Sequence, residues 1–265
     1  MAYSYAWKDI FRPGKADDFF QEESTHICKL CSPEFRSSDA WLLSELSRLM
    51  YMKGENETDA EQQIACRNQY LHKIGLKERW FYNGKRLQCA IVTTLPNRDR
   101  SFSVLVFRGT QGRLSTWLFN LKAALSSWPS GGQVHKGFAQ LLIEAWSDID
   151  LQLESLAPPL YYTGHSMGGA LAVLAASLRK PAAVYTFGSP KIGNSAFVNS
   201  IKQQKIHRVV NSRDVVATVP PIRGFEHAGE PQYLSGSQKQ FTRRLWIEAP
   251  GFLADHSPFN YSLHL

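Results

Sequence analysis

The chain has 265 residues, of which 43% are hydrophobic and 20% are charged, and its formal net charge is +7. This composition excludes a mainly disordered chain, a collagen-like repeat and a small disulfide-rich scaffold. No apolar run approaches the roughly 20 residues of a membrane-spanning helix, and no ordinary signal peptide is visible at the start. The basic residues are scattered, which argues against nucleic-acid binding and leaves an anionic membrane surface as a partner.

The four cysteines are one indication of the cellular compartment in which the protein works. Cys28 and Cys31 form a CxxC pair, whereas Cys66 and Cys89 stand apart. A structural zinc site normally needs a second pair of ligands at similar spacing, so we predict free thiols and no metal. A disulfide or a metal site at Cys28 and Cys31 is the alternative. We expect a cytoplasmic protein, or one exported by a non-classical route.

The amino-terminal segment 1–36 shows no clear periodicity, and two helices follow it. A serine or aspartate at positions 37 to 39 can cap the first helix, and Gly54 closes it. The second helix runs from about residue 58 to residue 74 and ends at Gly75. We expect both helices to pack against the rest of the protein without taking part in chemistry.

Strands come next. An Asn83-Gly84 pair between strand-like runs predicts a hairpin. The following runs, residues 89–94 and 103–107, are strands, and the second is continuously apolar, as in a central strand buried on both faces. Helices near 114–125, 138–156, 168–178 and 196–202 then alternate with strands near 160–163, 183–187 and 206–210. This order predicts one α/β domain over residues 1–265, with a largely parallel sheet after an antiparallel start.

Residues 164–168 read Gly-His-Ser-Met-Gly, a G-x-S-x-G pattern between a predicted strand and a predicted helix. That context is what a nucleophile elbow requires, because the sharp turn projects the serine hydroxyl above the sheet. We therefore predict Ser166 as a nucleophile and the amide of Met167 as an oxyanion donor. A glycine-rich turn with a capping serine is the alternative.

Ordered blocks over roughly residues 40 to 261 resemble the fungal-type class 3 lipases of the α/β-hydrolase superfamily. The blocks are Val106–Thr110, Trp117–Leu121, Val134–Phe138, Gly164–Gly168, Thr186–Asn194, Val210–Pro221 and Asp255-His256. The resemblance implies an α/β-hydrolase fold. This fold has a mostly parallel central sheet with antiparallel early strands, and helices on both faces.

The remaining catalytic residues follow from chain order and from this resemblance. In α/β-hydrolases the acid follows the serine and the histidine comes last. Asp214 follows the strand near 206–210, where its side chain can reach the carboxyl end of the sheet; a solvated turn carboxylate is the alternative. His256, with Tyr261 shortly after it, matches the family's catalytic histidine, and His227 and His264 are the other candidates.

The resemblance also supplies Thr110 as the second oxyanion donor, against a plain turn threonine. Residues 111–132 carry apolar residues at helical spacing between glycines. Family members often use the first part of this stretch as a lid, and a core-packing helix is the alternative. Trp117, Phe119 and Leu253 are candidate substrate contacts.

The resemblance therefore implies a triacylglycerol lipase or carboxylesterase that works through an acyl-enzyme and needs no cofactor. Its substrate would be a lipid or other ester, at a membrane or droplet surface. A phospholipase A1-type hydrolase is the near alternative, and a non-catalytic lipid-binding protein is the remote one. Acyl-chain length, head group and oligomeric state are left open.

Overall fold

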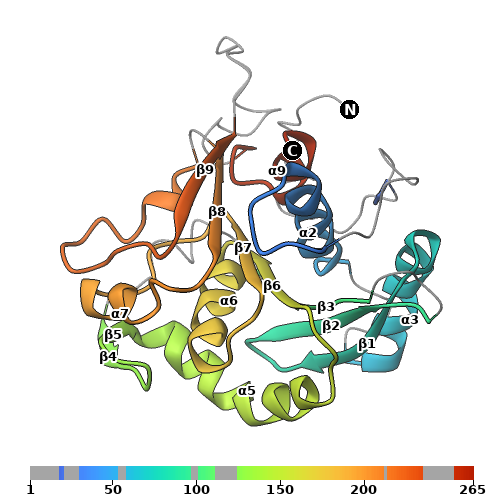
Figure 1. Cartoon of the computed structure of the whole chain (residues 1–265), viewed down its shortest axis with the longest axis horizontal. Coiled ribbons are helices and arrows are strands. Elements are labelled where there is room, and N and C mark those ends of the chain that lie inside the picture. The colour runs from blue at the N-terminus through green and yellow to red at the C-terminus, as the bar shows by residue number, and fades with distance from the viewer. Residues whose placement is uncertain are drawn as a thin grey trace.

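The architecture comes from a computed structural model, which describes residues 18–20, 30–52, 58–96, 101–110, 124–211, 214–234 and 254–265. A central sheet divides the molecule, with helices on both of its sides (Figure 1). Seven strands form this sheet in the order β1-β2-β3-β6-β7-β8-β9. The strands are β1 Leu76–Asn83, β2 Gln88–Thr94, β3 Ser103–Phe107, β6 Leu160–His165, β7 Ala183–Phe187, β8 Ile206–Asn211 and β9 Glu230–Leu234.

The pairing of neighbouring strands changes once along the sheet, from antiparallel to parallel. Strands β1, β2 and β3 pair antiparallel, and the pairs from β3 through β9 are parallel. The expected α/β-hydrolase architecture, with antiparallel early strands and a mostly parallel remainder, is confirmed. Because the carboxyl ends of parallel strands share one edge, the loops after β3, β6, β7 and β8 converge there.

Each face of the sheet has its own apolar core. The helices are α2 Ser37–Leu49, α3 Ala60–Leu71, α5 Lys136–Glu154, α6 Met167–Leu178, α7 Ser195–Ser200 and α9 Pro258–Leu263, with 3₁₀ turns at His72–Ile74 and Val216–Thr218. One core joins α5 and α6 to the sheet, and the other joins α2 and Tyr261 of α9 to the opposite face. Successive residues of β3 alternate between the two cores, which is why this strand is apolar throughout.

Local sequence signals set several element ends. Gly75 adopts φ 75° at the end of the 3₁₀ turn, as the left-handed position after a helix requires. The Asn83-Gly84 pair lies at the predicted hairpin, with Asn83 paired to Gln88. The expected side-chain cap of α2 is wrong, because Arg36 occupies the N-cap position and makes no capping hydrogen bond. Gly54 lies outside the described residues.

The prediction of a helix near residues 114–125 is wrong at its carboxyl end. Leu125 belongs to strand β4 (Leu125–Ser127), which pairs with β5 (Gln133–His135) in a separate two-stranded sheet. Residues 111–123, which hold most of the predicted lid, lie outside the described part of the chain. Cross-strand pairing thus decides the conformation of Leu125, and helical spacing of apolar residues does not report such pairing.

Cys31, Cys66 and Cys89 carry free thiols, and Cys28 lies outside the described residues. Within the described ranges no cluster of three or more histidine, cysteine, aspartate or glutamate side chains has metal-binding geometry. Among the helices described there, none combines the length and apolar character needed to span a bilayer.

Candidate active site

Ser166 lies at a sharp turn between β6 and α6. Its φ of 58° and ψ of −128° place a residue with a side chain in a backbone region that is normally costly. The Ser166 amide donates to the Phe187 carbonyl oxygen at 2.8 Å, which ties the turn to the end of β7. A Cβ on Gly164 would collide with the backbone of Gly168, so the tight approach of strand and helix needs these glycines.

Asp214 follows β8 and is buried, with three hydrogen-bond donors around its carboxylate. The Val216 amide donates to Oδ1 at 2.8 Å, and the Tyr261 hydroxyl donates to Oδ2 at 2.6 Å. His256 Nδ1 donates to the same Oδ2 at 2.8 Å. The carboxylate therefore holds His256 in one orientation, with Nδ1 protonated and Nε2 facing away.

Gly188 makes room for this pair. It follows β7 with φ 58°, and a Cβ at this position would collide with the Asp214 carboxylate and lie 2.9 Å from His256 Nδ1. Only glycine fits both the backbone conformation and the space. The resemblance marked this stretch as a family block but gave Gly188 no role.

Two polar atoms of the predicted triad have no hydrogen-bond partner among the described residues. They are Ser166 Oγ and His256 Nε2, and both are buried. A nucleophile and its base often lack a tight hydrogen bond until substrate arrives. The structure thus brings Asp214 and His256 into direct contact, whereas it records no hydrogen bond between Ser166 and His256.

His165 connects the serine turn to the histidine loop. Its Nε2 donates to the main-chain oxygen of His256 at 2.7 Å, and its Nδ1 accepts from the Tyr51 hydroxyl at 2.9 Å. The rings of His165 and His256 lie 4.5 Å apart. Burial, together with the neighbouring His256, lowers the pKa of His165 well below its ordinary value, so the imidazole is neutral. Its two hydrogen bonds hold the serine turn against the loop that contains His256. Tyr51 carried no signal in the sequence.

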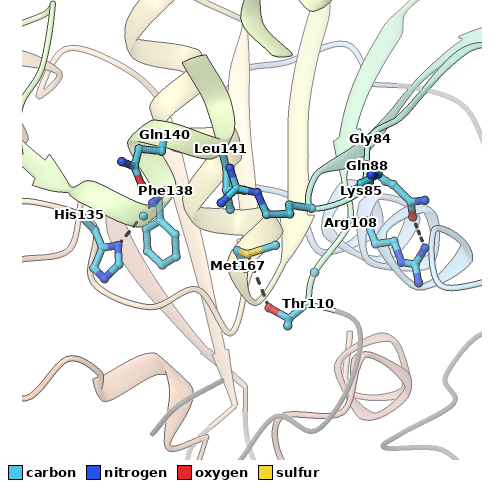
Figure 2. A pocket seen from close by; sticks show the side chains of 13 residues that line it. Gly84, Lys85, Gln88, Arg108, Thr110, His135, Phe138, Gln140, Leu141 and Met167 are labelled. Atoms are coloured by element: carbon cyan, nitrogen blue, oxygen red, sulfur yellow. Dashed lines mark hydrogen bonds between the residues drawn. The ribbon is translucent and has the colours of Figure 1, made fainter. Parts of the chain in front are cut away.

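Thr110 and Met167 lie against one another. The Thr110 hydroxyl donates to Met167 Sδ at 3.6 Å (Figure 2). Between β3 and Thr110, a Cβ on Gly109 would collide with the Tyr51 hydroxyl, so the loop after β3 also rests on this tyrosine. The other predicted substrate contacts, Trp117, Phe119 and Leu253, lie outside the described residues. His227 bonds the Ala217 carbonyl oxygen at 2.7 Å and is not the partner of Asp214.

A cavity of about 430 Å³ opens beside Thr110 and Met167. The β1–β2 hairpin, the loop after β3 and the start of α5 form its walls (Figure 2). It is lined by Gly84, Lys85, Arg86, Gln88, Arg108, Gly109, Thr110, His135, Gly137, Phe138, Gln140, Leu141 and Met167. Both predicted oxyanion donors thus border a space large enough for part of a lipid.

Residues 104–224 match the sequence model of the family described as lipase (class 3). This segment is therefore similar to the class 3 lipases. A secreted mono- and diacylglycerol lipase of Fusarium solani is 36% identical over 134 residues, which are 44% of this chain and 39% of that protein. A lipase of Rhizomucor miehei is 32% identical over 159 residues, 51% of this chain and 42% of that protein. The chain spans about two fifths of the length of these relatives.

Solved lipase structures share the fold. Lipase II of Rhizopus niveus has a TM-score of 0.55 at 25% identity, over 67% of this chain and 71% of that chain. The mono- and diacylglycerol lipase of Aspergillus oryzae has a TM-score of 0.65 at 18% identity, over 88% of this chain and 98% of that chain. The second likeness concerns the fold alone.

The prediction of a cytoplasmic or non-classically exported protein is wrong. The relative from Fusarium solani and two from Malassezia globosa are all named secreted mono- and diacylglycerol lipases. These names point to export and contradict the expectation of a cytoplasmic or non-classically exported protein. Scattered cysteines and the appearance of the first residues were therefore poor guides to the cellular compartment.

Proposed function

We propose that this protein hydrolyses carboxylic esters of acylglycerols through Ser166, Asp214 and His256. The observation that carries the proposal is the orientation of His256. Its Nδ1 is bound to the buried Asp214 at 2.8 Å, while its Nε2 has no partner among the described residues. The serine turn is tied to the same histidine through His165, which is next to Ser166 and bonds the His256 main chain.

The geometry supports an acyl-enzyme mechanism. His256 Nε2 takes the proton of Ser166 Oγ as that oxygen attacks the ester carbonyl carbon. Asp214 stabilises the imidazolium that forms. The amides of Met167 and Thr110 donate to the oxyanion, and His256 then gives its proton to the leaving alcohol. Water, deprotonated by His256, hydrolyses the acyl-enzyme and restores the serine.

Acylglycerols are the proposed substrates because the lipase segment covers the serine turn and Asp214, and because the secreted relatives are named mono- and diacylglycerol lipases. A lipid–water interface, at a membrane or droplet, is the proposed place of action, and the net charge of +7 favours an anionic one. A lid within residues 111–132 and a single domain over residues 1–265 stay predictions.

Replacing the nucleophile tests this proposal. We expect Ser166→Ala to lower kcat on p-nitrophenyl butyrate by about 10³-fold or more, because no other group takes over the attack. Ser200→Ala, at an exposed serine of α7, is the matched control and keeps full activity. A fluorophosphonate probe labels the wild type at Ser166 and leaves Ser166→Ala unlabelled. Full activity of Ser166→Ala, or no labelling of the wild type, contradicts the proposal.

A further inference from the structure

The loop that carries His256 is held through its own carbonyl oxygens. Those of residues 254–256 each accept a hydrogen bond from a side chain, and the three donors come from different elements of the fold. Asn260 Nδ2 donates to the first carbonyl at 2.9 Å, Asn211 Nδ2 to the second at 3.1 Å and His165 Nε2 to the third at 2.7 Å. All three donor side chains are buried. The position of the His256 ring therefore depends on these three bonds.

One of these three donors differs from the other two in its chemistry. An amide nitrogen always donates, whereas an imidazole nitrogen donates only in the tautomer that places the proton on it. A carbonyl oxygen only accepts, so the bond to His256 requires the proton on His165 Nε2. Because burial and the neighbouring His256 lower the pKa of His165 well below its ordinary value, the ring is neutral and its Nδ1 is an acceptor. A group that donates to Nδ1 therefore supports the bond to His256.

Tyr51 is placed to be that donor. Its hydroxyl oxygen lies 2.9 Å from His165 Nδ1, and the two rings meet edge-on with their centroids 5.8 Å apart. Burial raises the pKa of Tyr51, against opposing effects of Arg108 and of a hydrogen bond with the Gly109 backbone, so the phenol keeps its proton at neutral pH. A hydrogen bond that lowers the pKa of a phenol is one donated to its oxygen, so the Gly109 amide is the donor. The hydroxyl proton is thus left to bind His165 Nδ1.

We infer that Tyr51 is a positioning residue for the ester hydrolysis proposed above. Its hydroxyl holds the His165 ring in the tautomer and orientation that put the Nε2 proton on the main chain of His256. The amide of Tyr51 donates to the Arg48 carbonyl oxygen at 3.0 Å, so the last turn of α2 sets the place of the hydroxyl. The inference rests on the proposed function and gives α2, which carries none of the predicted catalytic groups, a part in holding the base.

Removing this hydroxyl should lower the rate of the chemical steps. We expect Tyr51→Phe to reduce kcat on p-nitrophenyl butyrate about tenfold with little change in KM, because His256 is held less firmly in the transition state. Tyr161→Phe is the matched control, since its buried ring lies on β6 and its hydroxyl donates to the Ser32 carbonyl oxygen at 3.3 Å, and it keeps the wild-type kcat. Urea unfolding shows that both variants are folded under the assay conditions. Unchanged kcat in Tyr51→Phe, or an equal loss in both variants, overturns the inference.

A double-mutant cycle tests whether Tyr51 acts through His165. His165→Gln keeps an amide donor for the main chain of His256 and removes the ring nitrogen that accepts the Tyr51 proton. We expect Tyr51→Phe to lower kcat about tenfold in the wild type and by less than about threefold in the His165→Gln background. The same factor in both backgrounds overturns the inference, because Tyr51 then acts by another route.

The state of the His165 ring gives a readout that does not depend on activity. In ¹⁵N NMR spectra of the labelled wild type at neutral pH, the signals lost in His165→Gln should be those of a neutral imidazole protonated on Nε2. In Tyr51→Phe the Nδ1 signal should move toward that of a nitrogen without a hydrogen bond. A charged ring or a proton on Nδ1 in the wild type overturns the inference. Absence of p-nitrophenyl butyrate hydrolysis by the wild type, with the expected spectra, would instead be a failure of the proposed function.

Discussion

At the residue scale, Tyr261 connects the Asp214 carboxylate to the backbone of β8. Its hydroxyl donates to Asp214 Oδ2 at 2.6 Å and accepts from the Asn211 amide at 3.1 Å. Burial and the nearby carboxylate raise the pKa of Tyr261 well above its ordinary value, so the hydroxyl stays protonated and remains a donor at neutral pH. Tyr261 therefore acts on His256 indirectly, as a positioning residue.

Removing this hydroxyl tests that role. We expect Tyr261→Phe to lower kcat about tenfold with little change in KM, because Asp214 loses one of its three donors and holds His256 less firmly. Steady-state kinetics on p-nitrophenyl butyrate measure this effect. The control is Tyr185→Phe, whose hydroxyl donates to the Glu34 carbonyl oxygen at 3.1 Å and should affect stability only. Equal loss of kcat in both variants would reduce Tyr261 to a structural role.

Sequence patterns point to the candidate residues that lie in motifs and leave the residues that support them unmarked. Ser166 was predicted from a local strand–turn–helix pattern, and Thr110 and His256 needed the family resemblance. Tyr51 and Gly188 were missed because their roles arise from distant contacts, such as the bond from Tyr51 to His165, 114 residues along the chain. No local pattern marks a tyrosine for such a contact.

At the element scale, a buried ion pair joins α3 to β1. Arg67 Nε and Nη2 donate to the two carboxylate oxygens of Glu78 at 2.6 Å each, and the guanidinium lies over the Phe81 ring at 4.2 Å. Burial raises the pKa of Glu78 from its ordinary value, although Arg67 opposes this shift. Each charge stabilises the other, because both side chains are almost completely removed from solvent.

Breaking this pair on one side should be costly. We expect Arg67→Met to lower the free energy of unfolding by about 3–5 kcal/mol, because it leaves Glu78 buried without its partner. The double variant Arg67→Met with Glu78→Leu should recover most of that loss, since no charge is then buried. Urea denaturation of both variants measures the difference. If Arg67→Met lowers the free energy of unfolding by less than the double variant does, this account is contradicted.

Predictions of elements succeeded where the signal was local. Gly75 and the Asn83-Gly84 pair end a helix and start a hairpin whatever the rest of the fold does, and β3 is apolar because both of its faces are buried. Leu125 was misassigned because β4 owes its conformation to pairing with His135 of β5, ten residues further along. The spacing of apolar residues along the sequence does not show which segments pair as strands, so it predicted a helix at Leu125.

At the scale of the whole molecule, stability should depend on Asp39 of α2. Its side chain is buried, Oδ2 has no hydrogen-bond partner among the described residues, and Arg36 Nε lies 3.9 Å away. Burial raises the pKa of Asp39 to about 6, against a partial opposing effect of Arg36. Because the folded state binds this proton more tightly than the unfolded state, stability from this group falls as pH rises from about 4 to about 6.

Asp39→Asn should therefore stabilise the protein at neutral pH. We expect its free energy of unfolding to exceed that of wild type by about 1–3 kcal/mol at about pH 7, where wild type buries an ionised carboxylate. The gain should be nearly lost near pH 4, where Asp39 is protonated in the folded state and about half protonated in the unfolded state. Urea unfolding at the two pH values measures it, and a gain that is the same at both would exclude the titration of Asp39 as its cause.

The contact between α2 and α9 has a consequence for synthesis. Helices α2 and α9 lie side by side (Figure 1). Ser44 of α2 donates to Ser262 of α9 at 3.0 Å, and Arg48 lies over the Phe259 ring. His256 directly precedes α9 in the chain. Translation proceeds at roughly 5–20 residues per second from the amino terminus, so α2 leaves the ribosome well before α9. A nascent chain cannot hold His256 against Asp214 until α9 has emerged, so the proposed triad assembles only after that stage of synthesis.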